Sequence, residues 1–463
     1  MTNVSIIGSG IGGLSAALNL AKKGFQVTVL EATDKPGGLA KSVSVSGNTF
    51  DAGPYVLLDK PGLEWAFEQV GLDLQSLNLK RIENVYSVEM DDSIFTVYSD
   101  LNKTIGELNA KWNKQGDHYA DFVTKTYKKY RQLIPFTFSA PSPIKIIKSG
   151  KLSLIPFLLS SLGKVLNTFG LNDPIKNGIG IWTHIAAQSL DKAPSPMSFV
   201  PGLIHHIGAY YPESGIGSIA DKLFNECVQH KVNFMFNSKA KKIRIQNNCV
   251  TGVEYNDNNF LECTHVISNN SAIDTYLNLI EETPVSFKNK IKTLPLQSPG
   301  VCVFLRVKGR PEGSYIKFKL EKDIPNCKSF ILPDIITQKN TETWMNARLV
   351  FPLPHEFSLT LSDTDCKKMI DAVLEESWWK AGITDFEVLS YNTPRTWSEK
   401  FVLYNKSMNP VMTSQFMRMG RMHHKSPYFK GLYFCGSSTH PGQWVSFCAI
   451  SGILTSNQLI KDL

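Results

Sequence analysis

The amino-terminal segment constrains the fold of this chain more than any other stretch. A short apolar run leads into Gly8, Gly10 and Gly13, a helical pattern follows, and a second apolar run ends at Glu31. The order strand, glycine turn, helix, strand and acid is the fingerprint of a dinucleotide-binding Rossmann unit. The first glycine permits the tight turn, the second lets a pyrophosphate approach the backbone, and the third lets the helix pack closely against the strand.

Glu31 and the start of the helix indicate which kind of nucleotide binds. The unpaired N–H groups and the dipole at a helix amino end favour phosphate. A carboxylate about 20 residues beyond the glycines accepts hydrogen bonds from an adenosine ribose. Because such a carboxylate would repel a 2′-phosphate, the sequence disfavours NADP. The alternative, an ordinary glycine-rich turn, gives no reason for the strands and the acid around it.

Composition limits the size and the partners of the fold. The chain has 463 residues, 42% of them hydrophobic, which is enough for two domains or one elaborated domain. The formal net charge of +8 is either spread over a solvated surface or gathered in a patch that faces anionic lipid. No basic run is interleaved with aromatic residues, so nucleic acid is not expected as a partner.

The eight cysteines are scattered, and none forms a Cys-x-x-Cys pair or a metal-binding spacing. We therefore expect reduced thiols in the core and no metal site. The first strand starts next to Met1, and no stretch reaches the ~20 apolar residues that cross a bilayer. These features predict a cytoplasmic protein. We further expect that it can bind peripherally to the cytoplasmic face of the membrane.

The patterns divide the chain into two interleaved domains. A nucleotide-binding domain is predicted from residues 1–75, 205–285 and 415–463, and a substrate-binding domain from residues 76–204 and 286–414. Within the first domain, hydrophobic periodicity predicts a helix over 218–230, strands over 232–236, 240–245, 249–255 and 264–269, a strand that ends near Gly436, and a helix over 445–460.

One stretch of the substrate domain has more than one interpretation. Near residues 141–169, apolar residues recur at helical spacing with lysines between them. Such a segment can lie in a membrane interface, cover the mouth of a lipid-binding tunnel, or pack as an ordinary core helix.

Three further motifs carry a resemblance to a known family. They are Phe50-Asp51-Ala52-Gly53-Pro54, Tyr211-Pro212 with the Gly215–Gly217 turn, and the strand that leads into Gly436-Ser437-Ser438-Thr439-His440-Pro441-Gly442. With the amino-terminal glycines, they make nearly the whole chain resemble the phytoene desaturase-type flavoproteins. That group includes carotenoid and dehydrosqualene desaturases, prolycopene isomerase and retinol saturase, within the amine-oxidase-like FAD superfamily.

The resemblance implies an α/β fold, in which a Rossmann-like FAD-binding domain of the amine-oxidase-like type carries an inserted mixed α+β substrate domain. It also implies FAD as the cofactor. By the same resemblance, backbone groups of Ala240 hold the adenine, and Gln443 to Val445 lie at the pyrimidine edge of the flavin. The motifs and the resemblance together predict as cofactor-binding residues Gly8, Gly10, Ile11, Gly12, Gly13, Glu31, Ala32, Gly38, Leu39, Lys41, Pro54, Tyr55, Ala240, Gly436, Ser437, Gln443, Trp444 and Val445.

Two positions depart from the family pattern. Leu39 stands where an arginine is common, and Gln443-Trp444-Val445-Ser446 replaces a glycine-rich continuation that is followed by proline. Trp444 is bulky, so we expect it to line and reshape the substrate channel beside the flavin, together with Tyr55.

The implied chemistry places the difficult step on the cofactor. A flavin abstracts a hydride from an allylic C–H of an apolar chain while the adjacent carbon loses a proton, so the protein positions the substrate and excludes water. This favours an FAD-dependent desaturase or dehydrogenase of a carotenoid-like or other isoprenoid polyene, with oxygen or a quinone as the electron acceptor. The alternatives are isomerisation or saturation of a polyene, an amine- or porphyrinogen-oxidase activity, and a flavin- or lipid-binding protein without turnover.

Histidines are the remaining candidates for acid–base chemistry. His440, in the loop expected next to the flavin, is the one candidate catalytic residue, as a proton carrier or a group that tunes the flavin. A hydrogen-bonded loop histidine is the alternative. The pairs His205-His206 and His423-His424 are interpreted as structural or surface residues, because neighbours on a strand point to opposite faces.

Overall fold

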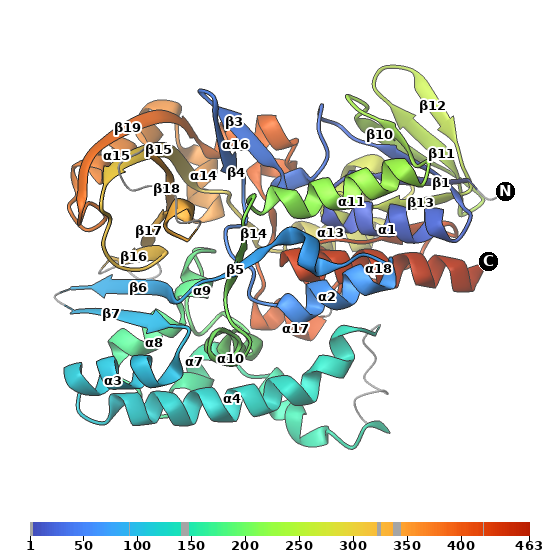
Figure 1. Ribbon diagram of the computed structural model, residues 1–463. Coiled ribbons are helices and arrows are strands. Elements are labelled where there is room, and N and C mark those ends of the chain that lie inside the picture. Colours follow the sequence, from blue (N-terminus) through green and yellow to red (C-terminus); the bar gives the residue numbers. More distant parts are fainter. Residues whose placement is uncertain (1–2, 92, 140–147, 322–325, 337–343, 420) are drawn as a thin grey trace.

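The computed structural model describes residues 3–91, 93–139, 148–321, 326–336, 344–419 and 421–463. Its centre is a parallel sheet in the order β21-β13-β1-β2-β9. The strands of this sheet are β1 (Asn3–Ile7), β2 (Gln26–Leu30), β9 (Asn233–Met235), β13 (His265–Ser268) and β21 (Leu432–Phe434). Since β1 pairs with β2 and β13, and β13 pairs with β21, the middle and the end of the chain complete the sheet that the amino-terminal segment begins (Figure 1).

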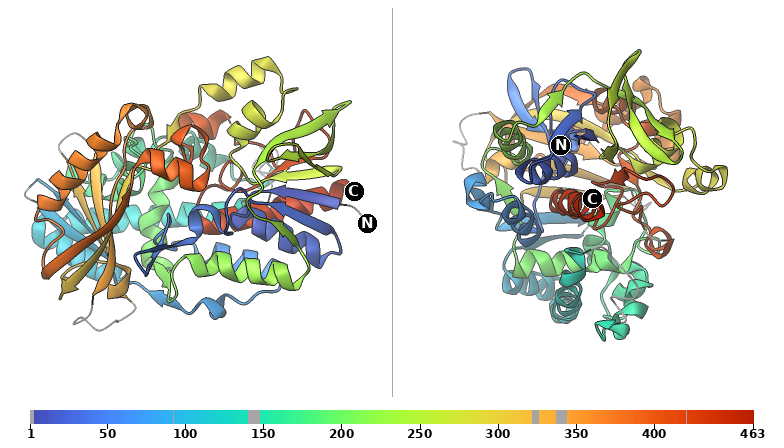
Figure 2. Two further views of the ribbon diagram at one scale, coloured as in Figure 1. Left: turned by 90° about the horizontal axis from the view of Figure 1, so that it is seen from above. Right: turned by 90° about the vertical axis from the view of Figure 1, so that its right-hand side faces the viewer.

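The two faces of this sheet are covered by different layers. Helices form one layer and a small antiparallel sheet the other (Figure 2). The consecutive residues Ile6 and Ile7 belong to the two separate cores, as the two-residue period of a strand requires. The helices are α1 (Ile11–Lys22), α2 (Lys60–Gln69), α11 (Gly217–Gln229) and α18 (Val445–Asp462), and the small sheet consists of β10 (Ala240–Gln246), β11 (Cys249–Tyr255) and β12 (Asn259–Glu262).

Close packing holds the last helix of the chain against the glycine turn. A Cβ atom on Gly452 of α18 would lie 2.2 Å from the carbonyl oxygen of Gly12 in α1. Only glycine at position 452 therefore lets the two helices approach this closely. As a result, the amino end of α18 and the amino end of α1 lie on the same side of the sheet.

A second sheet of seven strands lies at the other end of the molecule, in the order β19-β15-β18-β17-β16-β6-β7 (Figure 1). Its strands are β6 (Asn84–Met90), β7 (Ser93–Tyr98), β15 (Val301–Gly309), β16 (Ile316–Leu320), β17 (Cys327–Ile331), β18 (Met345–Phe351) and β19 (Ile383–Asn392). The parallel pairing of β6 with β16 joins segments far apart in sequence. Helix α15 (Asp363–Glu375) contributes Cys366, Ile370 and Val373 to the core on one face.

Helices below this sheet form a third layer (Figure 1). The main ones are α3 (Leu101–Lys111), α4 (Gln115–Thr137), α8 (Asp173–Ile179), α9 (Ile181–His184) and α10 (Val200–His206). The pair His205-His206 lies at the end of α10. The argument from strand alternation therefore does not apply to this pair, because both residues lie on a helix. Structural roles hold nonetheless, since the His205 ring contacts the Tyr119 hydroxyl at 2.9 Å and His206 stacks on Tyr127.

The segment near 141–169 does not form one long helix where it is described. It forms the short turns η3 (Leu152–Leu154), α6 (Ile155–Leu158) and α7 (Leu162–Leu166). Leu154, Phe157, Leu162, Val165 and Leu166 are buried, whereas Leu152 and Leu159 are exposed by 52% and 53%. Residues 140–147 of this prediction lie outside the described residues. Among the described helices, none has the length and apolarity needed to cross a membrane.

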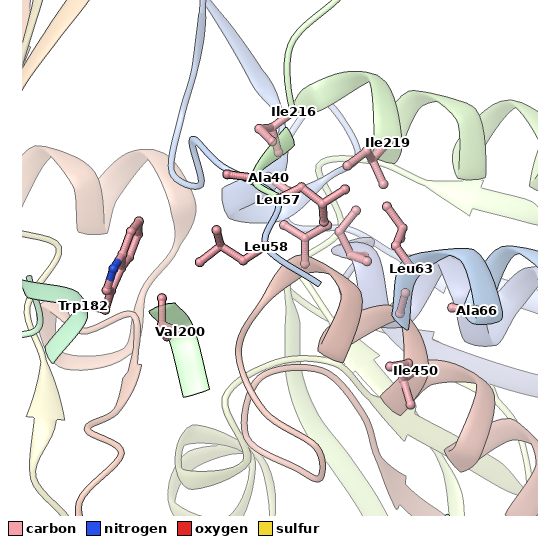
Figure 3. Packing of buried hydrophobic residues seen from close by; sticks show 14 of the residues in the cluster. Ala40, Leu57, Leu58, Leu63, Ala66, Trp182, Val200, Ile216, Ile219 and Ile450 are labelled. Atoms are coloured by element: carbon pink, nitrogen blue, oxygen red, sulfur yellow. The ribbon is translucent and has the colours of Figure 1, made fainter. Parts of the chain in front are cut away.

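The two halves of the molecule share one hydrophobic core. Leu57 and Leu58 lie between α11 and α10 of the third layer, with Ile216 on one side and Val200 on the other (Figure 3). Strand β5 (Leu79–Arg81) pairs with the distant strand β8 (Tyr210–Pro212) in a separate two-stranded sheet. Further elements of the chain are β3 (Ser42–Val45), β4 (Asn48–Asp51), β14 (Leu296–Gln297), β20 (Asn409–Pro410), α13 (Val285–Lys292), α14 (His355–Thr360), α16 (Pro394–Phe401) and α17 (Ser414–Met419).

Asp51 fixes the junction between the two halves through its side chain. Its carboxylate is buried and accepts hydrogen bonds from the Tyr211 hydroxyl at 2.6 Å and from the Ile216 and Gly217 amides at 2.8 and 3.4 Å. The carboxylate thus caps the start of α11 and ties the Tyr-Pro and Gly-Pro motifs together. The fold class predicted from the sequence, a Rossmann-like domain with an inserted mixed α+β part, is confirmed.

Candidate cofactor and substrate site

A cavity of about 750 Å³ opens where β1, β2 and β13 end. Ligands of open α/β sheets bind at the carboxyl ends of the strands, so this cavity is the candidate cofactor site. Of the residues predicted from the sequence, those that line it are Gly8, Gly10, Ile11, Gly12, Glu31, Ala32, Gly38, Leu39, Pro54, Ala240, Ser437, Gln443 and Val445.

The glycine turn has the geometry that a pyrophosphate needs. Gly8 has a φ of +91°, which favours glycine, and a Cβ atom on Gly13 would lie 2.1 Å from the Gly8 carbonyl oxygen. Gly10 is the N-cap of α1 and no described side chain caps this end. The first N–H groups of α1 therefore remain available for an anion. These features fit the phosphates of FAD.

Glu31 lies at the end of β2 and is 7% exposed. Its Oε2 atom accepts hydrogen bonds from the Ser9 amide at 2.9 Å and the Ser9 hydroxyl at 2.6 Å. Its Oε1 atom accepts from the Thr33 amide at 2.9 Å and the Thr33 hydroxyl at 2.8 Å. Hydroxyl donors thus surround the carboxylate, and ribose hydroxyls are donors of the same chemistry.

Five predicted residues do not line the cavity but support its wall. Gly13 packs beneath the turn, and a Cβ atom on Gly12 would lie 2.8 Å from the Cα atom of Gly436. Lys41 points to Thr33, with its Nζ atom 3.2 Å from the Thr33 hydroxyl, and its ammonium group lies over the Phe401 ring.

Tyr55 and Trp444 complete this set of five. The Tyr55 carbonyl accepts a hydrogen bond from the Tyr315 hydroxyl, and the Arg348 guanidinium lies 5.9 Å from the centre of its ring. Trp444 is the N-cap of α18 and stacks on Phe447, with ring centres 5.1 Å apart. The Tyr55 and Trp444 rings both pack against the hydrophobic core that the two halves share. Their contact with a substrate stays a prediction.

His440 is anchored to helix α4 of the third layer. Its Nε2 atom donates to the carbonyls of Phe136 and Thr137, at 3.0 and 3.1 Å, at the end of α4. Burial lowers its pKa to about 3, so the ring is neutral at pH 7 and its Nε2 proton is already shared. This arrangement favours the alternative of a loop-anchoring histidine, and the catalytic role stays a prediction.

Asn269 is a lining residue that the sequence reasoning did not single out. It follows β13 directly, and its side-chain amide lies among three glycines. Cβ atoms on Gly10, Gly12 and Gly436 would lie 2.8, 2.6 and 2.4 Å from this amide. Its position after a strand predicted to belong to the nucleotide-binding sheet was a usable signal, because strand ends form the ligand edge.

A longer stretch of the wall comes from a distant part of the sequence. Phe401, Leu403, Tyr404 and Met408, around the end of α16, line the cavity. Asn409 of β20 also lines it and accepts a hydrogen bond from the Ser437 hydroxyl. No local motif marks this segment, since only the tertiary fold brings it over the Rossmann sheet.

Known proteins match this chain in both sequence and structure. The family model described as an NAD(P)-binding Rossmann-like domain matches residues 6–67. Phytoene desaturase of Fusarium fujikuroi is 26% identical over 99% of this chain and 89% of that protein. The 4,4'-diaponeurosporene oxygenase of Staphylococcus aureus is 23% identical over 97% of this chain and 96% of that protein.

Solved structures support the fold. A Methanosarcina mazei oxidoreductase superposes with a TM-score of 0.71 at 17% identity, over 99% of this chain and 100% of that chain. Putrescine oxidase bound to putrescine has a TM-score of 0.63 at 14% identity, over 99% of both chains. Fold and cavity thus define an oxidoreductase of the Rossmann type. Within that class, the chain is similar over nearly its whole length to oxidoreductases of the phytoene desaturase type.

Proposed function

We propose that the chain binds FAD and oxidises a carotenoid-like or other isoprenoid polyene. The observation that carries this proposal is that one cavity has in its wall both the glycine turn after β1 and the first residues of α18. The first holds an ADP group in proteins with this fingerprint. The start of α18 presents helix N–H groups to the same cavity, and such groups stabilise the negative charge on a reduced flavin.

The residues of this chain have distinct tasks in that reaction. FAD, when bound, supplies the acceptor for a hydride from an allylic C–H. Glu31 would hold the ribose, the start of α1 the pyrophosphate, and Gln443 with Val445 the pyrimidine edge. Tyr55 and Trp444 would hold the polyene and exclude water. Phytoene and diaponeurosporene, the compounds in the names of the relatives, make a polyene the best-supported substrate class.

A peripheral membrane contact fits such a substrate, which resides in lipid. Leu152 and Leu159 present exposed apolar surface, and Lys148 and Lys151 precede them. Apolar side chains with adjacent cations bind anionic bilayers. Flotation with liposomes of anionic lipid tests this, and a protein that stays at the bottom of the gradient contradicts it. Replacement of both leucines by serine should abolish flotation.

An anaerobic spectrum of the FAD-loaded protein with phytoene-containing liposomes tests the reaction. Bleaching of the flavin bands together with a more conjugated product supports desaturation. A polyene that changes geometry while the flavin stays oxidised indicates isomerisation, and a reduced flavin reoxidised by the polyene indicates saturation. Bleaching by an amine, with none by any polyene, would contradict the proposal. The same preparation, opened to oxygen or given a quinone, identifies the electron acceptor.

A further inference from the structure

Arg421 is a half-buried side chain whose guanidinium has no anionic partner in the described part of the chain. Its Nε and Nη1 atoms are buried and find no hydrogen-bond partner there. Its Nη2 atom contacts the thioether sulfurs of Met412 and Met417, at 3.3 and 3.7 Å. A buried charge without a partner destabilises a fold. A chain that keeps such a charge therefore gains something else from it.

Arg421 lies directly behind the wall of the cavity. A Cβ atom on Gly442 would lie 2.7 Å from its Nη1 atom. The thiol of Cys448, which lines the cavity, contacts the Gly442 carbonyl at 3.7 Å. Gln443, which follows Gly442 in the chain, also lines the cavity. Its buried Oε1 atom has no hydrogen-bond partner among the described residues. The cation thus adjoins the end of the cavity where α18 begins.

Three described titratable groups near Arg421, the side chains of His440, His424 and Cys448, carry no charge at pH 7. Burial lowers the pKa of His440 to about 3 and that of His424 to about 4, and it raises the pKa of the Cys448 thiol to about 12. Burial also lowers the pKa of Arg421, to about 10, which leaves it protonated. Its positive charge therefore acts on the cavity without compensation from its described surroundings.

We propose that Arg421 stabilises the negative charge that a flavin in this cavity gains on reduction, and thereby raises the reduction potential of that flavin. This inference rests on the proposed function. A hydride brings two electrons and one proton to the ring, so the ring gains one full negative charge, while the proton lost by the substrate goes to solvent or a base. In a water-poor site a fixed cation beside the developing charge is worth far more than in water. The first N–H groups of α18 add to the same field.

The reduction potential of the FAD-loaded protein tests this role. In R421M the new thioether joins Met412 and Met417, so we expect an equal or higher melting temperature together with a lower potential. A 10- to 100-fold shift of the reduction equilibrium corresponds to about 30–60 mV for a two-electron couple. R421K, which keeps the charge, should retain most of the wild-type potential, and R421Q provides a second neutral side chain if R421M does not fold.

A matched control removes a buried cation elsewhere. Lys317 of β16 is 8% exposed and lies in the seven-stranded sheet, so K317M should leave the potential unchanged. An R421M protein that binds FAD at the wild-type potential overturns this inference alone. A wild-type protein that binds no FAD overturns the proposed function and this inference together.

Discussion

Replacement of Glu31 by glutamine should destabilise the protein even without a cofactor. The carboxylate is 7% exposed and accepts four hydrogen bonds, two on each oxygen, from the amides and hydroxyls of Ser9 and Thr33. An amide of the same shape turns an NH₂ group toward one of these two residues. The hydroxyl there can rotate and accept, but the backbone N–H cannot.

The expected magnitude follows from that one lost bond. A hydrogen bond from a buried N–H to a charged acceptor is worth about 1.5–3 kcal/mol, so E31Q should lower the free energy of unfolding by about 2 kcal/mol. Ser9→Ala removes only a hydroxyl donor and should cost about 1 kcal/mol. Urea unfolding of the apoprotein, followed by circular dichroism, measures both values.

The control is Glu68→Gln on the exposed side of α2, where a change within about 0.5 kcal/mol is expected. If E31Q unfolds at the same urea concentration as the wild type, the buried hydrogen-bond arrangement described for Glu31 is wrong. Because ribose hydroxyls need the same carboxylate, E31Q should also raise the Kd for FAD by about tenfold, which is about 1.4 kcal/mol.

Three further perturbations probe other parts of the structure. Asn269→Asp places a negative charge next to the turn that would meet the pyrophosphate, so titration calorimetry should show an FAD Kd at least about tenfold higher than that of the wild type. The control Asn102→Asp, on the surface, should leave the Kd unchanged. Equal FAD affinities of N269D and the wild type would exclude Asn269 from the site. Asp51→Ala leaves the Ile216 and Gly217 amides and the Tyr211 hydroxyl without their acceptor and should lower the free energy of unfolding by at least about 2 kcal/mol, against about 1 for Tyr211→Phe, in chemical denaturation. Burial lowers the pKa of four histidines from 6.5 to about 3 or 4, so the unfolded state binds their protons first as the pH falls. Stability is then fully present above about pH 6.5 and declines below it, by up to about 2 kcal/mol per histidine at pH 5; a melting temperature that stays constant from pH 7 to 5 would contradict this. These histidines are His184, His205, His424 and His440.

Features that depend on short stretches of sequence could be predicted closely. The helix expected over 218–230 is α11 at Gly217–Gln229, and the strand expected over 249–255 is β11 at Cys249–Tyr255. Hydrophobic periodicity and glycine turns are local, and so are the positions that they set. The same holds for the glycine turn itself, where steric contact between Gly13 and Gly8 leaves no other residue type.

Features that depend on distant segments could not be predicted. Phe401 and Met408 line the cavity although nothing in their own sequence marks a ligand site. Arg421 looks like an ordinary surface arginine in the sequence, and only the packing of Met412 and Gly442 around it shows that part of its guanidinium is buried. The helical location of His205-His206 was missed because two adjacent polar residues carry no periodicity of their own.

The most direct test of the account is a titration of the apoprotein with FAD, compared with FMN. Both carry the flavin, but only FAD has the ADP group that the glycine turn and Glu31 would hold. The account predicts one FAD bound per chain, with FMN at least about tenfold weaker. No saturable binding of FAD, or equal binding of FMN, would contradict the assignment of this cavity to a flavin dinucleotide.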